Sequence, residues 1–71
     1  MPVSYDKLWK VLIDKKMTRT ELKDAAKISF NVLAKMGRNE FVSMESLYKL
    51  CLTLNCDIGD IMEFKTKENI R

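Results

Sequence analysis

Three side chains between residues 29 and 38 carry groups that could recognise a partner. They are an aromatic ring, a carboxamide and an ammonium group, on Phe30, Asn31 and Lys35. The apolar residues of this segment recur at helical spacing on another side, so the three groups are predicted to face outward. A carboxamide both donates and accepts hydrogen bonds, and a lysine donates three. The segment is therefore suited to binding.

Residues that could catalyse a reaction or hold a metal are scarce. The chain has no histidine, and its two cysteines, Cys51 and Cys56, cannot complete a tetrahedral zinc site alone. It has no nucleophile paired with a base and no glycine-rich phosphate loop, and 71 residues leave little room for a closed pocket. The sequence predicts no enzyme activity, no cofactor and no metal site. Both cysteines are expected as reduced, buried thiols.

The charges divide unequally along the chain. Residues 1–38 contain nine basic and four acidic side chains, whereas residues 39–71 contain four basic and six acidic ones. A single lysine is best interpreted as solvated. The concentration of positive charge around the outward-facing groups nevertheless indicates a surface that could face phosphates.

Two short helices joined by a tight turn are predicted around these groups. Thr18 and Glu21 form a capping-box pattern at the start of the first helix, and Ser29 is the N-cap of the second. Between them, Lys27 ends the first helix and Ile28 is an apolar plug in the turn. The predicted contact points of the two crossed helices are Leu22, Ala25 and Ala26, then Val32, Leu33 and Met36. This arrangement is a helix-turn-helix.

Three more helices are predicted from the same rules. Ser4 caps a first helix that runs to about Lys16, Ser43 caps a fourth that Asn55 closes, and Asp57 opens a last short one. An apolar loop, Phe41 and Val42, is expected to fold back over the core. The apolar stripes of the three helices are Tyr5, Leu8, Trp9, Leu12 and Ile13; Leu47, Leu50, Cys51 and Leu54; and Ile58, Ile61, Met62 and Phe64.

Size and composition indicate a single domain over residues 1–64, followed by a charged, frayed tail over residues 65–71. A chain of this length lies near the lower limit for folding without a metal or disulfide, so dimerisation would help. We find no signal peptide, lipidation site or long apolar run, which predicts a cytoplasmic protein with no membrane partner. No small-molecule effector is evident.

The segments MTRTELKDAAKIS and SMESLYKLCLTLNCDIGDIMEF resemble the Cro/C1-type helix-turn-helix regulators, the lambda repressor-like or XRE family, over Ser4 to Phe64. The ending NCDIGDIMEF is similar to a subfamily of short, stand-alone regulators. The resemblance implies an all-α fold, a compact five-helix lambda-repressor-like DNA-binding domain, in which the second and third helices form the helix-turn-helix.

Two positions depart from the family pattern. Many relatives carry glycine where Lys27 stands, because the residue that closes the second helix adopts a left-handed conformation. Many also pair an arginine on the first helix with a glutamate after the third. Leu12 and Gly37 match those positions here, and we expect an apolar contact between them. Asn39 is a plausible left-handed residue after the third helix.

The resemblance also implies which residues would contact DNA. Phe30, Asn31 and Lys35 would read bases: lysine can donate to guanine, asparagine can pair with adenine, and phenylalanine can pack on a thymine methyl. Two alternatives remain open, that Phe30 covers the turn as a staple and that Lys35 binds phosphate only. The residues expected to contact the DNA backbone are Thr18, Arg19, Ser29, Arg38, Asn39, Ser43 and Met44.

These observations predict a sequence-specific regulator of transcription that binds double-stranded DNA through the major groove. It would be a repressor that binds a palindromic operator as a homodimer, with half-sites about 10 base pairs apart. The competing hypothesis is a protein-interaction module, such as an antitoxin or adaptor, because a fold does not determine a function.

Overall fold

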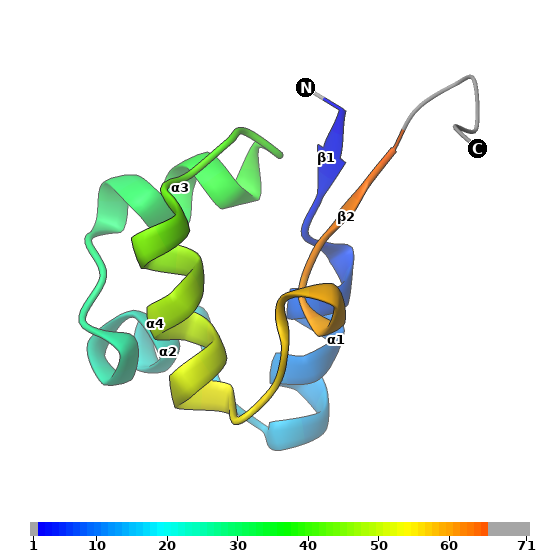
Figure 1. The fold of residues 1–71 in the computed structure, drawn as a ribbon. Coiled ribbons are helices and arrows are strands. Elements are labelled where there is room, and N and C mark those ends of the chain that lie inside the picture. Colours follow the sequence, from blue (N-terminus) through cyan, green and yellow to red (C-terminus); the bar gives the residue numbers. More distant parts are fainter. Residues whose placement is uncertain (1, 66–71) are drawn as a thin grey trace.

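The computed structural model describes residues 2–65 and contains four α-helices, one 3-10 helix and two short strands (Figure 1). The elements are β1 (Val3–Ser4), α1 (Asp6–Lys15), α2 (Arg19–Ala26), α3 (Phe30–Gly37), α4 (Met44–Leu54), η1 (Ile58–Asp60) and β2 (Glu63–Phe64). The fold is mostly helical, as the predicted all-α class implies, and it also contains a small two-stranded sheet. The predicted number of five helices is wrong. The segment after Asp57 forms a single 3-10 turn in place of a fifth α-helix, and residues 66–71 of the predicted tail lie outside the described part.

Helix starts and ends follow the local sequence signals. Thr18 and Glu21 form the predicted capping box, and the hydroxyls of Ser29 and Ser43 each accept a hydrogen bond from the backbone N–H three residues later. Four non-glycine residues with positive φ follow the helices: Lys16 (55°), Lys27 (59°), Asn39 (57°) and Asn55 (55°). The predicted left-handed conformations of Lys27 and Asn39 are confirmed, and Asn55 closes α4 as predicted.

The start of the chain differs from the prediction. Ser4 does not cap α1: it lies in β1, where it pairs with Glu63, and Tyr5 occupies the N-cap position without a side-chain cap. The antiparallel pairing of β1 with β2 explains the difference, since it draws residues 3 and 4 into an extended conformation. The Ser4 hydroxyl still accepts a hydrogen bond from the Asp6 N–H, at 3.2 Å.

Twelve buried residues form one hydrophobic core to which α1, α2, α3, α4 and β1 all contribute. The predicted plug Ile28 is buried, and α2 packs mainly against α4. The predicted stripes are too wide at their margins: Ile13 is 73% exposed and Ala25 is also exposed. Each is next in sequence to a buried residue, and the rotation of the helix between successive residues turns its side chain toward solvent.

The two cysteines lie beside this core. Cys51 and Cys56 are half-buried and carry free thiols. Burial is the main cause that raises the pKa of Cys51 to about 11. The thiol of Cys51 is therefore protonated at neutral pH.

Candidate nucleic-acid interface

The outward side of α3 carries the three groups predicted to read bases. Phe30 is 64% exposed, Asn31 is exposed and Lys35 is half-buried. The helix contains no acidic residue in its first turn or elsewhere, so no carboxylate of α3 itself repels a phosphate. Opposite them, Leu33 and Met36 are buried and hold the helix on the core. The structure thus brings the three predicted groups onto one accessible helix.

The Phe30 ring is held in place from the preceding helix. The Lys23 ammonium lies 4.5 Å from the centroid of the ring, a cation–π contact, and donates a hydrogen bond to Asp24 at 2.7 Å. Lys23 therefore lies over the Phe30 ring, while most of the Phe30 side chain remains exposed. The geometry is compatible with both roles considered for Phe30, as a staple and as an apolar base contact.

The positive charges of Lys35 and Arg38 are partly balanced by the carboxylate of Glu40. The Arg38 Nε donates to a Glu40 Oε2 at 2.8 Å, and this hydrogen bond lowers the pKa of Glu40 below its usual value. Lys35 adds a weaker attraction in the same direction. Both partners of the pair are solvent-accessible, so a phosphate could compete with Glu40 for the guanidinium group.

The N-termini of α2, α3 and α4 differ in the side chains that accept hydrogen bonds from their backbone N–H groups. In α2 the Glu21 carboxylate accepts the Thr18 N–H at 2.8 Å, which places a negative charge at that end. At the start of α3, Ser29 caps Val32 and no carboxylate is present. Ser43 caps α4 in the same way. The amides of the first helical residues, Met44 among them, have no partner within their helix and can donate to an anion.

Arg19 lies in a slot formed by α1 and α3. Its guanidinium carbon is 3.8 Å from the centroid of the Trp9 ring. Its Nη1 would lie 3.6 Å from a Cβ built on Gly37, and no Leu12 atom lies within 4 Å of that position. The space beside Gly37 in this direction is therefore taken by the Arg19 side chain, where an apolar contact with Leu12 was expected. This arginine comes from the start of α2 and not from the first helix.

The loop after α3 is tied to the start of α1. The Tyr5 hydroxyl donates to the Glu40 carbonyl at 2.8 Å, and the Tyr5 N–H donates to the Asn39 Oδ1 at 3.3 Å. Burial raises the pKa of the Tyr5 hydroxyl. Asn39, predicted to touch the DNA backbone, thus uses its side-chain oxygen inside the protein, and its contact with DNA stays a prediction.

Three residues of this site were not identified from the sequence: Trp9, Lys23 and Glu40. The apolar pattern predicts Trp9 as part of the core-facing stripe, whereas it is half-buried and stacks on Arg19. Its contact spans ten positions across a turn, and no local spacing rule could indicate it. The charge of Glu40 beside Arg38 was the one signal available.

Within residues 2–65 we find no group of three histidine, cysteine or acidic side chains arranged to hold a metal ion. No helix in this part of the chain is both long enough and apolar enough to cross a membrane.

Comparison with known proteins places this geometry in a family. The family model of the Cro/C1-type helix-turn-helix DNA-binding domain matches residues 7–67. The crystal structure of the transcriptional regulator VanUg is similar, with 52% sequence identity, a TM-score of 0.85, and coverage of 87% of this chain and 83% of that chain. A search of curated proteins finds no match. The predicted resemblance and the lambda-repressor-like fold are confirmed: this chain belongs to the Cro/C1-type helix-turn-helix family, whose domain binds DNA.

Proposed function

We propose that this protein is a sequence-specific regulator of transcription that inserts α3 into the major groove of double-stranded DNA. The observation that carries the proposal is the outward side of α3. It presents Phe30, Asn31 and Lys35 on a helix without acidic residues, anchored from below by Leu33 and Met36. The similarity to VanUg, described as a transcriptional regulator, supports the same function.

In this proposal the base-reading groups have different tasks. Asn31 would make a bidentate contact with adenine, Lys35 would donate to guanine, and the exposed part of Phe30 would pack on a thymine methyl. Each good polar contact would contribute about 1–3 kcal/mol of discrimination between bases.

The contacts that position the domain would come from both ends of the helix-turn-helix. Arg19 would bind a phosphate from its slot at the start of α2. The other positioning contacts would come from the backbone or side chains of Thr18, Ser29, Arg38, Asn39, Ser43 and Met44. Such contacts fix the register of the protein on the duplex and carry no sequence information themselves.

One domain of this size contacts few phosphates, so specific binding at physiological salt requires a second copy. We propose a homodimer on a palindromic operator, with the two α3 helices about one helical turn of DNA apart. Bound near a promoter, such a dimer would act as a repressor by obstructing polymerase.

A DNA titration followed by fluorescence anisotropy tests the proposal. The operator is first selected from a random duplex library, and its symmetry shows whether the site is palindromic. Lys35→Ala is expected to weaken binding to the operator about 5- to 150-fold, with little effect on random duplex. Arg19→Ala is expected to weaken both DNAs alike and to reduce the slope of affinity against salt by about one.

Lys49→Ala is the matched control, because Lys49 lies on α4, pairs with Glu45 at 3.7 Å and is not one of the proposed contacts. Equal losses for Lys35→Ala on both DNAs would remove Lys35 from base recognition. An affinity for random duplex that does not rise as salt is lowered would refute DNA binding and favour the protein-interaction alternative.

A further inference from the structure

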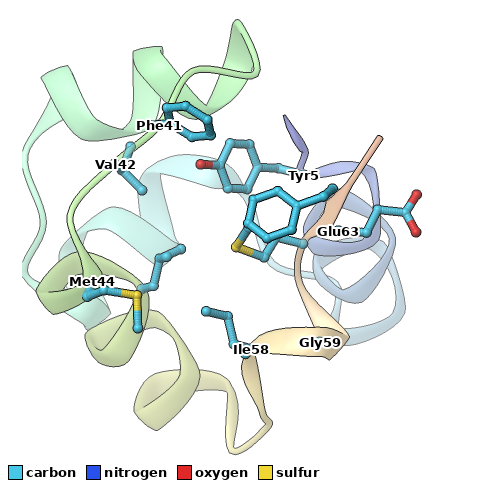
Figure 2. A pocket seen from close by; sticks show the side chains of 10 residues that line it. Tyr5, Phe41, Val42, Met44, Ile58, Gly59 and Glu63 are labelled. Carbon is cyan, nitrogen blue, oxygen red and sulfur yellow. The ribbon is translucent and has the colours of Figure 1, made fainter. Parts of the chain in front are cut away.

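An apolar hollow of about 410 Å³ opens between the start of α4 and β2. Figure 2 shows Phe41, Val42 and Met44 along one side of this apolar groove and Ile58 and Gly59 along the other. Phe64 also lines it. Three of its side chains are largely exposed, Phe41 by 51%, Met44 by 69% and Phe64 by 70%. Exposed apolar side chains gathered around one hollow indicate a surface that another molecule covers.

The outer edge of β2 borders this groove and has backbone groups that no residue within 2–65 pairs with. Phe64 pairs with Val3, and the Lys65 N–H donates to the Pro2 carbonyl at 2.9 Å. In an antiparallel ladder successive residues direct their N–H and C=O groups to opposite sides. Because Lys65 faces β1, the N–H and C=O of Phe64 face the outer edge, where the described residues supply no third strand.

The charged residues on this edge are arranged so that two copies of the strand could pair with opposite charges facing each other. Glu63 and Lys65 flank Phe64 and lie on one face of the strand, with Lys65 Nζ 3.6 Å from a Glu63 Oε2. If β2 pairs antiparallel with a copy of itself about a two-fold axis at Phe64, the two Phe64 residues lie opposite each other. Glu63 then lies opposite Lys65 of the second copy, and Lys65 opposite Glu63 of the second copy. Opposite charges in such cross-strand positions stabilise the pairing.

The aromatic side chain lies on the useful face of this sheet. Residues paired across an antiparallel ladder share a face, so Phe64 is on the same side as Val3, which is 2% exposed and faces the core. In the paired arrangement both copies therefore lie on the same side of a four-stranded sheet. The Phe64 side chains meet at its centre, beside the two apolar grooves.

We propose that the occupant of the apolar groove is a second copy of this chain, docked by antiparallel pairing of the two β2 strands around Phe64. The inference rests on the homodimer of the proposed function and adds the surface, the register and the residues that form it. An isologous contact of this kind requires a surface complementary to itself, and the sequence Glu63-Phe64-Lys65 meets that requirement.

The first test measures the dimer dissociation constant by sedimentation equilibrium without DNA. Phe64→Ala is expected to raise this constant about thirtyfold, as for an aromatic residue at the centre of an interface. The matched control is Leu52→Ala, which removes an apolar side chain that is 62% exposed and does not line the groove. A parent chain that remains monomeric at about 0.5 mM, close to the highest usable concentration, would overturn the proposal. So would equal effects of the two variants, since the groove would then have another occupant.

A charge exchange tests the register. In homodimers of Lys65→Glu the facing residues are both glutamate, and in homodimers of Glu63→Lys both are lysine, so each variant is expected to dimerise about fivefold more weakly. Mixed in equal amounts, the two variants form heterodimers in which every facing pair is again opposite in charge. We expect the mixture to recover the parent dimer fraction. A mixture as weakly dimeric as the two variants would overturn this register.

Circular dichroism of each variant provides the folding control, because Glu63 also lies 3.7 Å from Lys7 within the monomer. The anisotropy titration separates this inference from the proposed function. A dimer that depends on Phe64 but does not bind DNA would preserve the interface and refute the regulator. A DNA-binding protein whose dimerisation ignores Phe64 would refute the interface alone.

Discussion

The two surfaces proposed to bind partners are built in different ways. The helix-turn-helix surface consists of capped helix ends and charged side chains, with Arg19, Lys35 and Arg38 around α3. The β2 surface consists of exposed apolar side chains around a hollow, with charges only at its margin. The first surface suits a hydrated polyanion, whereas the second gains stability mainly by excluding water. Substitutions on one surface should therefore leave the other intact, whereas substitutions of core residues should impair both.

The largest expected effect comes from Met36, which would damage both surfaces together. Met36 is fully buried on the inner side of α3, so Met36→Ala is expected to lower the free energy of unfolding by about 2–5 kcal/mol. In a domain of this size such a loss approaches the total stability, so DNA binding and dimerisation should fail together. Urea denaturation followed by circular dichroism measures the loss. The control is Leu52→Ala: this leucine is 62% exposed and does not line the groove, so its loss should change stability by less than about 0.5 kcal/mol.

Trp9→Leu is expected to impair only the helix-turn-helix surface. Without the indole ring, the Arg19 guanidinium loses the face on which it stacks, so DNA affinity should fall about tenfold on operator and random duplex alike. The dimer dissociation constant should remain unchanged. Tyr48→Leu is the control, because it removes an exposed aromatic ring from α4.

A double-mutant cycle makes the same prediction stricter. If Trp9 acts through Arg19, Trp9→Leu should weaken DNA binding in the parent and have no further effect once Arg19→Ala is present. Additive losses would show that the ring contributes to binding by some route other than positioning the arginine.

Lys27→Gly is expected to stabilise the helix-turn-helix by about 0.5–1 kcal/mol, because glycine adopts the observed φ of 59° without the strain of a side chain. Thermal unfolding should shift upward by a few degrees, in line with about 4–8 °C per kcal/mol for small domains. Lys10→Gly, at an exposed position inside α1, should instead destabilise the protein by about 1 kcal/mol. A lower melting temperature for Lys27→Gly would contradict the interpretation of that turn.

The smallest expected effect concerns the pair formed by Arg38 and Glu40. Glu40→Gln should release the guanidinium group and raise the affinity for random duplex about two- to threefold, with a slightly steeper salt dependence. Since the pKa of Glu40 is lowered in the folded protein, the ion pair is present above that pKa and is lost as the pH falls through it. Anisotropy titrations of parent and variant at pH 7 test the prediction; Glu45→Gln on α4 is the control.

The helix-turn-helix could be predicted almost residue by residue because its signals are local. Thr18, Ser29 and Ser43 each accept a hydrogen bond from the backbone N–H three residues later, so a short stretch of sequence contains the whole signal. The strands could not be predicted, since two residues give no periodicity and β1 meets β2 about 60 positions later. The slot around Arg19 escaped prediction for the same reason, because Trp9 and Gly37 become neighbours only through the packing of three helices.

The two hydrogen bonds of Tyr5 connect regions that would otherwise respond independently. Its backbone directly follows β1, while its hydroxyl and N–H hold the segment that follows α3. A displacement of the small sheet when two copies associate would therefore be transmitted to the segment next to the DNA. Assembly and operator affinity would then be thermodynamically coupled through the two hydrogen bonds of Tyr5. Removing the hydroxyl would weaken this coupling, because the Tyr5 N–H alone would still hold Asn39.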